Sequence, residues 1–179
     1  GFEIYHDKAK DTVMAILMLA MMVPFVAVLV PLFQMFTKAK LINSWTGFIL
    51  PSIATPFLIM YFRNSARSFP RDTLEAARID GLNEFQIFIR MFIPMMKPTY
   101  ASAATITFMG AWNAYLWPKV VMQTNEAITM PMLVANTMGG YVIDYGVVMA
   151  AVTICSLPTV IIFFCLQKSF TNAVAGAVK

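Results

Sequence analysis

Residues 145–167 read YGVVMAAVTICSLPTVIIFFCLQ, and none of these 23 residues is charged. A helix that crosses the hydrocarbon core of a bilayer needs about 20 apolar residues, within a range of about 17–25. This stretch is therefore long and apolar enough to form a membrane span. Three further stretches meet the same test, at residues 12–37, 41–62 and 98–118. The sequence thus predicts an all-α, polytopic helical membrane protein with four spans, at about residues 12–36, 45–62, 99–117 and 146–167.

The overall composition excludes a water-soluble globule. Of the 179 residues, 59% are hydrophobic and only 12% are charged, and the mean hydropathy is +0.70. Soluble domains carry about 25% charged residues. The charged residues of this chain are also confined to the segments between the predicted spans, as a membrane protein requires.

Prolines and glycines should distort this helical framework. Pro24 and Pro31 lie inside the first predicted span and should kink it, because each removes a helical hydrogen bond. A fifth uncharged stretch, residues 127–143, contains Pro131 and the pair Gly139-Gly140. We expect this stretch to form short helical pieces at one membrane surface and not a span.

Lysine and arginine residues are divided unequally between the two sides of the predicted membrane. Four spans place both termini on one side. That side holds ten basic residues: Lys8, Lys10, Arg63, Arg67, Arg71, Arg78, Arg90, Lys97, Lys168 and Lys179. The other side holds three: Lys38, Lys40 and Lys119. The positive-inside rule makes the first side cytoplasmic. The net charge of +4 therefore reflects topology, and no nucleic acid partner is expected, because no basic stripe alternates with aromatic residues.

The sequence lacks the patterns of a catalyst or of an ion-coupled carrier. His6 is the only histidine, no H-E-x-x-H or G-x-S-x-G pattern occurs, and no G-x-x-x-x-G-K-[ST] loop could cradle ATP. We therefore expect neither catalytic nor metal-binding residues. The spans also lack interior ionisable residues, which proton relays and ion-coupled carriers require. A solute passing here should be uncharged and hydroxylated, driven by energy from another protein. A self-sufficient carrier or channel and a membrane-embedded enzyme stay open as alternatives.

The third predicted span has two different faces. Small residues recur at helical spacing on one face: Ala103, Thr107, Gly110 and Ala114. Such stripes let membrane helices pack closely. The opposite face carries hydroxyl groups, a thioether and an indole: Ser102, Thr105, Met109 and Trp112, with Asn113 beside them. These five residues either line a polar pathway or make hydrogen bonds between helices, and the sequence leaves both interpretations open.

The loop after the second span contains an amphipathic segment. Residues 75–98 read EAARIDGLNEFQIFIRMFIPMMKP. We expect a short helix capped by Asp72 or Thr73, and a turn at Gly81 with positive φ. A second helix should run from about Asn83 to Phe92 and end before Pro94.

The second helix has an apolar face that should need a partner. Phe85, Phe88, Ile89 and Phe92 follow i, i+3, i+4, i+7 spacing, and Ile87 and Met91 widen this face. An apolar helix in the cytoplasm can dock into the groove of another protein. It can also lie on the lipid surface or beneath its own spans. Physical reasoning alone does not separate these possibilities.

The same loop resembles the EAA loop of ABC-importer permeases. The pattern E-A-A-x-x-D-G, followed by F, P and P, is formed by Glu75, Ala76, Ala77, Asp80, Gly81, Phe88, Pro94 and Pro98. Other segments resemble the second permease subunit of maltose-type carbohydrate importers. They include Met22-Val23-Pro24, Leu50-Pro51 and Gly110-x-Trp112-Asn113. The resemblance extends over nearly the whole chain.

This resemblance implies the transmembrane fold of type I ABC importers, in a single domain over residues 1–179. It implies cytoplasmic coupling helices at residues 72–92 within that domain. Such permeases usually have more than four spans, so we expect the chain to be the C-terminal part of a longer protein. The expected location is the cytoplasmic (inner) membrane of a bacterium or archaeon.

The resemblance also implies a function and partners. The chain would form part of the pathway for a carbohydrate: an oligosaccharide, a disaccharide, or a related polyol or glycerol phosphate. The expected partners are a paralogous permease subunit, two ABC ATPase subunits, an extracytoplasmic sugar-binding protein and membrane lipid. ATP and Mg²⁺ would bind the ATPase subunits, so this chain would hold no cofactor and would not be an enzyme. The expected ATPase-coupling residues are Glu75, Ala76, Ala77, Asp80, Gly81, Phe85, Phe88, Ile89, Phe92 and Pro94.

Overall fold

The computed structural model describes residues 8–124, 127–140 and 143–176, and every regular element in these ranges is a helix. The α-helices are α1 (Lys8–Met21), α2 (Phe25–Lys38), α3 (Trp45–Ile49), α4 (Pro56–Arg67), α5 (Arg71–Ile79), α6 (Glu84–Ile87), α7 (Ile93–Met95), α8 (Lys97–Trp112), α9 (Leu116–Val121), α10 (Met130–Thr137) and α11 (Tyr145–Gly176). A 3₁₀ turn, η1 (Leu50–Ser52), and a π-helical turn, η2 (Phe88–Phe92), complete them. The all-α prediction is confirmed for these residues.

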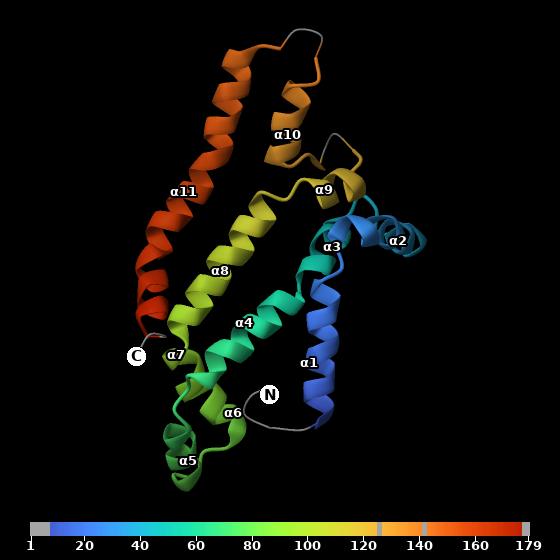
Figure 1. Cartoon of the computed structure of the whole chain (residues 1–179). Coiled ribbons are helices and arrows are strands. Elements are labelled where there is room, and N and C mark those ends of the chain that lie inside the picture. The colour runs from blue at the N-terminus through green and yellow to red at the C-terminus, as the bar shows by residue number, and fades with distance from the viewer. Residues whose placement is uncertain (1–7, 125–126, 141–142, 177–179) are drawn as a thin grey trace.

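The long helices α1, α4, α8 and α11 run between two ends of an elongated molecule (Figure 1). Helices α5, α6 and α7 lie at the lower end in this view, where α1 begins and α11 ends. Helices α9 and α10 lie at the upper end. Helix α8 packs along α11 and also contacts α4. The segment with the EAA pattern therefore sits at one end of the molecule, away from the turns that join the other ends of the long helices.

The first predicted span is not one helix. Helix α1 ends at Met21, helix α2 begins at Phe25, and their axes differ by 102°. The break falls at Pro24, which has no N–H and which disfavours helical geometry in the preceding residue. Pro31, in contrast, lies inside α2 without interrupting it. The sequence predicted a kink at Pro24, and the structure shows a sharp corner there.

The second and third predicted spans also differ from their expected bounds. The second is bent by 42° between Trp45–Ser52 and Pro56–Arg67, and Thr55 caps the second part through a 3.3 Å bond from the Leu58 N–H. The third, α8, ends at Trp112. The next residue, Asn113, donates both its backbone N–H, at 3.1 Å, and its side-chain amide, at 2.9 Å, to the Met109 carbonyl.

Helix α11 confirms the helical character of the stretch quoted first, and it extends past it to Gly176. Its portion Tyr145–Leu166 is the one described helix that is long and apolar enough by itself to cross a membrane. If each of the two bent pairs counts as one crossing, the described residues contain up to three. The fifth uncharged stretch forms the short α10, as predicted for its described part.

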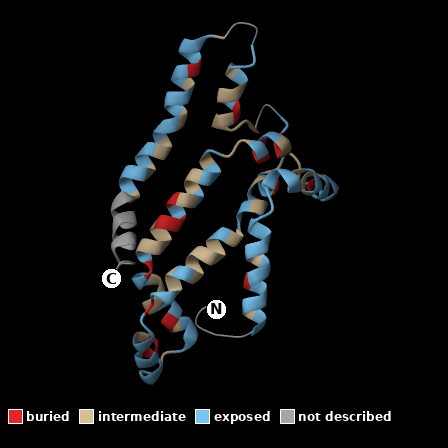
Figure 2. Cartoon of the chain, in the orientation of Figure 1, coloured by how far each residue is buried: buried red, intermediate tan, exposed pale blue. Residues whose placement is uncertain are grey.

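Two clusters of buried side chains lie toward the two ends; α1 and α11 are mostly exposed, whereas α4 is mostly intermediate and α8 carries buried residues near its middle (Figure 2). The lower cluster contains Phe69, Leu74, Ala77, Ile87 and Met96. The upper cluster contains Phe36, Trp117, Val121 and Met122. Many large apolar side chains of α1, α2 and α11 are exposed and do not pack into a core. Exposed apolar surface on this scale is typical of chains that contact lipid or other subunits.

The upper cluster depends on Trp117, which fixes α9 against α2 and α3. Its ring meets Phe36 edge to face with centroids 5.2 Å apart, and its indole N–H donates to the Gly47 carbonyl at 3.3 Å. Gly47 is itself buried, and a Cβ there would collide with the Leu41 carbonyl. A glycine is therefore required where the chain turns into α3.

An ion pair ties the beginning of α1 to α4 near the lower end. Arg63 Nη2 lies 3.1 Å from Asp11 Oδ1, and the Arg63 side chain is 15% exposed. The two residues are 52 positions apart in sequence. The pair therefore joins two long helices that are far apart in sequence.

Candidate functional site

Helix α5 begins without a side-chain cap. Its N-cap residue is Pro70, which makes no side-chain capping bond, and Arg71 is the first helical residue. The prediction that Asp72 or Thr73 caps this helix was wrong. Pro70 has φ −63° and an extended ψ of 120°, and the helix begins at the next residue. Asp72 then lies in the first turn, where its charge favours the positive end of the helix dipole.

Gly81 ends α5 in the conformation that the sequence predicted. Its φ is +78°, and its N–H donates to the Arg78 carbonyl at 3.1 Å. The N–H of Leu82 donates to the Ala77 carbonyl, also at 3.1 Å. This pair of bonds defines a Schellman motif, which satisfies the last carbonyl groups of a helix. The positive φ at its C′ position suits glycine, which has no Cβ to clash.

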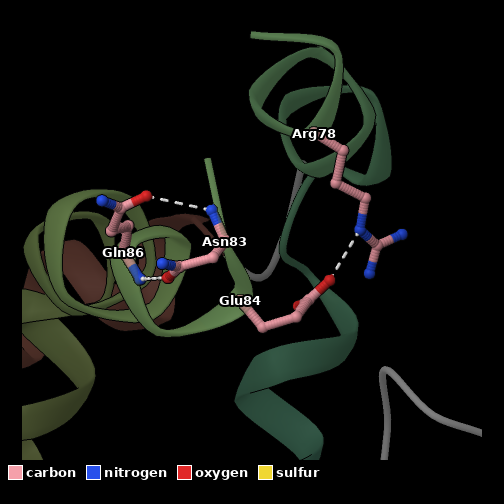
Figure 3. A network of polar contacts seen from close by, with 4 residues as sticks. All are labelled: Arg78, Asn83, Glu84 and Gln86. Atoms are coloured by element: carbon pink, nitrogen blue, oxygen red, sulfur yellow. Dashed lines mark hydrogen bonds and ion pairs between the residues drawn. The ribbon is translucent and has the colours of Figure 1, made fainter. Parts of the chain in front are cut away.

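Polar contacts fix the entry into α6 and its angle to α5 (Figure 3). The Gln86 N–H donates to Asn83 Oδ1 at 2.9 Å, and the Asn83 N–H donates to Gln86 Oε1 at 3.0 Å. This reciprocal pair is a capping box. Arg78 Nε donates to Glu84 Oε1 at 2.9 Å and so connects the two helices across the turn. The segment is therefore ordered by local bonds on both sides of Gly81.

The second helix continues beyond the point where it was predicted to stop. After α6, the chain passes through the π-helical turn η2 and enters α7, which contains Pro94. The Ile93 N–H donates to the Phe88 carbonyl, five residues earlier, and this wider turn accommodates the proline. The prediction that the helix ends before Pro94 was therefore wrong. Proline is tolerated here because α7 begins one residue before it, where its missing N–H is not needed.

Burial divides the predicted apolar face into a packed part and an exposed part. Ile87 is only 2% exposed and Ala77 only 1%, and both belong to the lower cluster. Phe92 packs against the same cluster, with its ring centroid 5.1 Å from that of Phe69. The prediction that Ile87 widens the apolar face of Phe85, Phe88 and Ile89 was wrong, because Ile87 packs into the lower cluster with Leu74 and Ala77 of α5. Met91 also packs inward.

Four other large apolar side chains of this segment are exposed, and one of them, Phe88, stacks on Phe92 with ring centroids 5.7 Å apart. Phe85 is 71% exposed, and Phe88 and Ile89 are 44% and 45% exposed. Ile79, at 86%, extends this set from the end of α5. We call these four residues the coupling surface. Sequence reasoning missed Ile79, although an isolated apolar residue between Arg78 and Asp80 at a helix end was a usable signal.

Most other members of the EAA pattern are exposed. Ala76, Asp80 and Gly81 are exposed, and so is Glu75, whose carboxylate makes no hydrogen bond or ion pair within the described part of the chain. Pro94 is exposed further along the segment. Exposed charges and apolar rings within one rigid element can together recognise a protein partner.

The small-residue face of α8 was expected to pack against another helix, but within this chain much of it is exposed. Ser102 and Thr105 are buried, and Trp112, on the same face, donates its indole N–H to the Cys155 carbonyl of α11 at 2.9 Å. On the small-residue face, Thr107 and Gly110 are exposed, and a Cβ at Gly110 would meet open space, whereas Ala103 is buried. Within this chain, the hydrogen bond from α8 to α11 comes from the polar face, and the small-residue face is buried only near Ala103.

Two members of the polar set are less enclosed. Met109 is half-buried and Asn113 is exposed. Thr105 Oγ1 donates to the Ala101 carbonyl at 2.9 Å, whereas the buried hydroxyl of Ser102 has no partner. No three His, Cys, Asp or Glu side chains come together as metal ligands among the described residues.

Comparisons with known proteins place this geometry in context. Residues 4–176 match the family model described as binding-protein-dependent transport system inner membrane component. The chain is 40% identical over 179 residues to the lactose transport system permease protein LacG of Rhizobium radiobacter, covering 100% of this chain and 66% of that protein. It is 34% identical over 180 residues to the arabinooligosaccharides transport system permease protein AraQ of Bacillus subtilis (strain 168), covering 100% and 64%.

A solved structure shares the fold. A chain from the crystal structure of a bacterial ABC transporter involved in the import of the acidic polysaccharide alginate superposes with a TM-score of 0.81 at 23% identity. The superposition covers 93% of this chain and 64% of that chain. The present chain thus spans slightly less than two thirds of the length of the relatives that it matches.

Proposed function

This chain belongs to the family of binding-protein-dependent transport system inner membrane components, and from that premise we propose that it is a permease subunit of an ATP-driven importer. We propose a carbohydrate as the solute: an oligosaccharide, a disaccharide, or a related polyol or glycerol phosphate. The names of two relatives, which refer to lactose and to arabinooligosaccharides, support this class. The predicted spans, which lack interior charges, also suit an uncharged hydroxylated solute.

The observation that carries the proposal is the coupling surface. A rigid segment holds Ile79, Phe85, Phe88 and Ile89 outward, although ordered apolar side chains normally find a partner. We propose that a groove on an ATPase subunit receives this surface, and that Glu75 pairs with a basic group beside it. Helix-in-groove docking buries such a face and transmits movement of the groove to the helix.

The coupling mechanism follows from how the segment is attached. Ala77 and Ile87 fix α5 and α6 to one cluster, and Met96 joins that cluster to the beginning of α8. Movement of an ATPase groove would therefore reach α8, and through α8 the long helix α11. We propose that the pathway alternates between outward-open and inward-open states by such rigid-body movement.

We propose that the chain crosses the cytoplasmic membrane of a bacterium or archaeon four times, with both termini in the cytoplasm. The unequal distribution of Lys and Arg supports this orientation. The beginning of α1 and the end of α11 lie toward the end of the molecule that carries α5 and α6, which supports it further (Figure 1). Each bent helix pair would then make one crossing, and α8 and α11 would make the other two.

We propose that α8 contributes to the pathway through its polar face. In the present conformation, Met109 and Asn113 are the members of that set with exposed surface. Ser102, Thr105 and Trp112 would reach the pathway only when α8 and α11 separate. The exposed small-residue face at Thr107 and Gly110 would receive a helix of the paralogous permease subunit.

The remaining proposed partners are two ABC ATPase subunits, an extracytoplasmic sugar-binding protein and membrane lipid. ATP and Mg²⁺ would bind the ATPase subunits and not this chain. The test is co-expression of the permease complex, followed by ATPase pull-down from detergent-solubilised membranes and by sugar-stimulated ATP turnover in proteoliposomes. A panel of labelled sugars identifies the solute. Solute uptake by this chain without an ATPase would refute the proposal and favour a self-sufficient carrier.

A further inference from the structure

Two buried hydroxyl groups lack a hydrogen-bond partner on the two helices that pack along each other. Ser102 belongs to α8 and Thr159 to α11. The hydroxyl oxygen of each is closed off from solvent, and neither has a hydrogen-bond partner in the described part of the chain. Ser102 as a whole residue is only 1% exposed. An unpaired buried hydroxyl destabilises the state that contains it, so both groups call for an explanation.

The local partner that helices offer to a hydroxyl is not used by these two residues. A serine or threonine in a helix can donate to the carbonyl four residues earlier. Five other helical hydroxyls of this chain do so: Thr12, Thr37, Thr105, Thr153 and Ser156. For Thr159 that carbonyl is the one of Cys155, which accepts the Trp112 indole N–H at 2.9 Å. For Ser102 it is the carbonyl of Pro98, in the first turn of α8. Hydroxyls on these helices can thus be satisfied locally, and Ser102 and Thr159 are not.

The two hydroxyls gain partners only if the helices move. Both oxygens are already inaccessible within this single chain, so no other subunit reaches them while the present packing holds. Thr159 lies about one turn beyond Cys155, where α11 accepts the hydrogen bond from α8. Separation of α8 and α11 would open this contact. A separated state in which the hydroxyls find partners recovers the hydrogen bonds that the packed state lacks, so the unpaired groups favour separation.

We propose that Ser102 and Thr159 are solute-binding hydroxyls that become available when α8 and α11 separate. This inference rests on the permease function proposed above, which supplies an uncharged, hydroxylated solute. A sugar hydroxyl can both donate to and accept from the hydroxyl of serine or threonine. Solute binding then replaces two unpaired groups with two hydrogen bonds, and it stabilises the separated state over the packed one.

The first measurement is the thermal unfolding temperature of the detergent-purified permease complex, without ATP and without sugar. Ser102→Ala and Thr159→Val remove the unpaired hydroxyls, and each should raise this temperature by about 2–4 °C for a chain of this length. Thr105→Val is the matched control, because the buried Thr105 hydroxyl donates to the Ala101 carbonyl, and it should give no rise. An unchanged or lower temperature for Ser102→Ala or Thr159→Val would show that the hydroxyl already has a partner, such as a bound water, and would remove that residue from the proposal.

The second measurement tests contact with the solute by single-cysteine labelling during ATP turnover, in a background without Cys155 and Cys165. Lactose, maltose and other labelled disaccharides are the probes. Ser102→Cys and Thr159→Cys should react with a polar thiol reagent only during turnover, and a disaccharide that the complex takes up should slow this reaction. Gly110→Cys, on the exposed face of α8, is the control, and sugar should leave its labelling unchanged. Equal slowing at positions 102, 159 and 110 would overturn the solute contact.

Failure of this inference can be told apart from failure of the proposed function. Uptake and ATP turnover are measured first on the parent complex. If that complex takes up none of the disaccharides, the proposed solute class fails together with this inference. If it takes up a disaccharide that has no effect on labelling at positions 102 and 159, the permease function stands and only the assignment of these two hydroxyls is overturned.

Discussion

Arg78 and Glu84 form an ion pair across the Gly81 turn, with Arg78 Nε 2.9 Å from Glu84 Oε1. Both side chains are substantially exposed, at 44% and 55%. Exposed pairs of this kind contribute about 0–1 kcal/mol to stability. The role of this pair is therefore to set the angle between α5 and α6 more than to stabilise the fold.

Charge exchange tests that role. Glu84→Arg should reduce ATPase co-purification, because like charges push α6 away from α5, while thermal unfolding changes little. The double variant Arg78→Glu with Glu84→Arg should restore co-purification, since the pair is rebuilt in reverse. Pull-down at matched permease levels is the measurement. If the double variant binds no better than the single one, the ion pair does not orient the segment.

Substitutions at Gly81 should rank by their tolerance of positive φ. No atom lies within 4 Å of the position that a Cβ would take at Gly81, so backbone strain accounts for the cost. Left-handed geometry costs an ordinary residue about 1–2 kcal/mol, whereas Asn tolerates it and a β-branched residue tolerates it least. We expect ATPase binding and uptake to fall in the order Asn, Ala, Val. Equal activity for Gly81→Asn and Gly81→Val would contradict this explanation.

Substitutions at two positions of α6 should affect ATPase binding and fold stability separately. Phe85→Ala removes a 71% exposed ring and should leave the melting temperature unchanged, while ATPase binding weakens by roughly 2 kcal/mol if the ring is an anchor. Ile87→Ala opens a cavity in the lower cluster and should cost about 2–5 kcal/mol of stability. Thermal unfolding and pull-down are measured on both variants. The coupling surface is misassigned if Phe85→Ala and Phe88→Ala both keep full ATPase binding and uptake.

Two glycines should respond differently to an added methyl group. Gly47→Ala should destabilise the chain, because its Cβ would collide with the Leu41 carbonyl, and the loss should appear as poor recovery from membranes. Gly110→Ala should be tolerated by the chain itself, since its Cβ meets open space. Gly110→Leu should instead block assembly if a helix of another subunit packs there. Normal complex formation by Gly110→Leu would place that contact elsewhere.

Single cysteines on α8 test the proposed pathway. A polar thiol reagent should label Met109→Cys and Asn113→Cys in the resting complex, because these positions have exposed surface. Ser102→Cys should stay unlabelled there, since Ser102 is 1% exposed, and should gain reactivity during ATP turnover if α8 and α11 separate. A Gly110→Cys control reports the other face. Preferential labelling at position 110 over 109 and 113 would reverse the proposed assignment.

The sequence by itself determined the helical class and the local geometry of the coupling segment. Long uncharged stretches can satisfy their backbone groups in a membrane only as helices or closed barrels, and their continuous apolar character favours helices. The positive φ at Gly81 was predictable because the conformation at a helix C′ position depends mainly on the type of residue there. The EAA pattern also indicated the family from the sequence alone, because its residues lie within one short segment.

The tertiary structure decided which faces are used. Helical spacing placed Phe85 and Phe92 on one apolar face, but only the position of the lower cluster determined that Phe92 packs inward while Phe85 stays exposed. Likewise, only the packing of α8 against α11 brought the Trp112 indole to a carbonyl 43 residues away in sequence. Periodicity gives the faces of a helix, whereas the neighbour of each face depends on contacts between distant segments, which a local pattern does not contain.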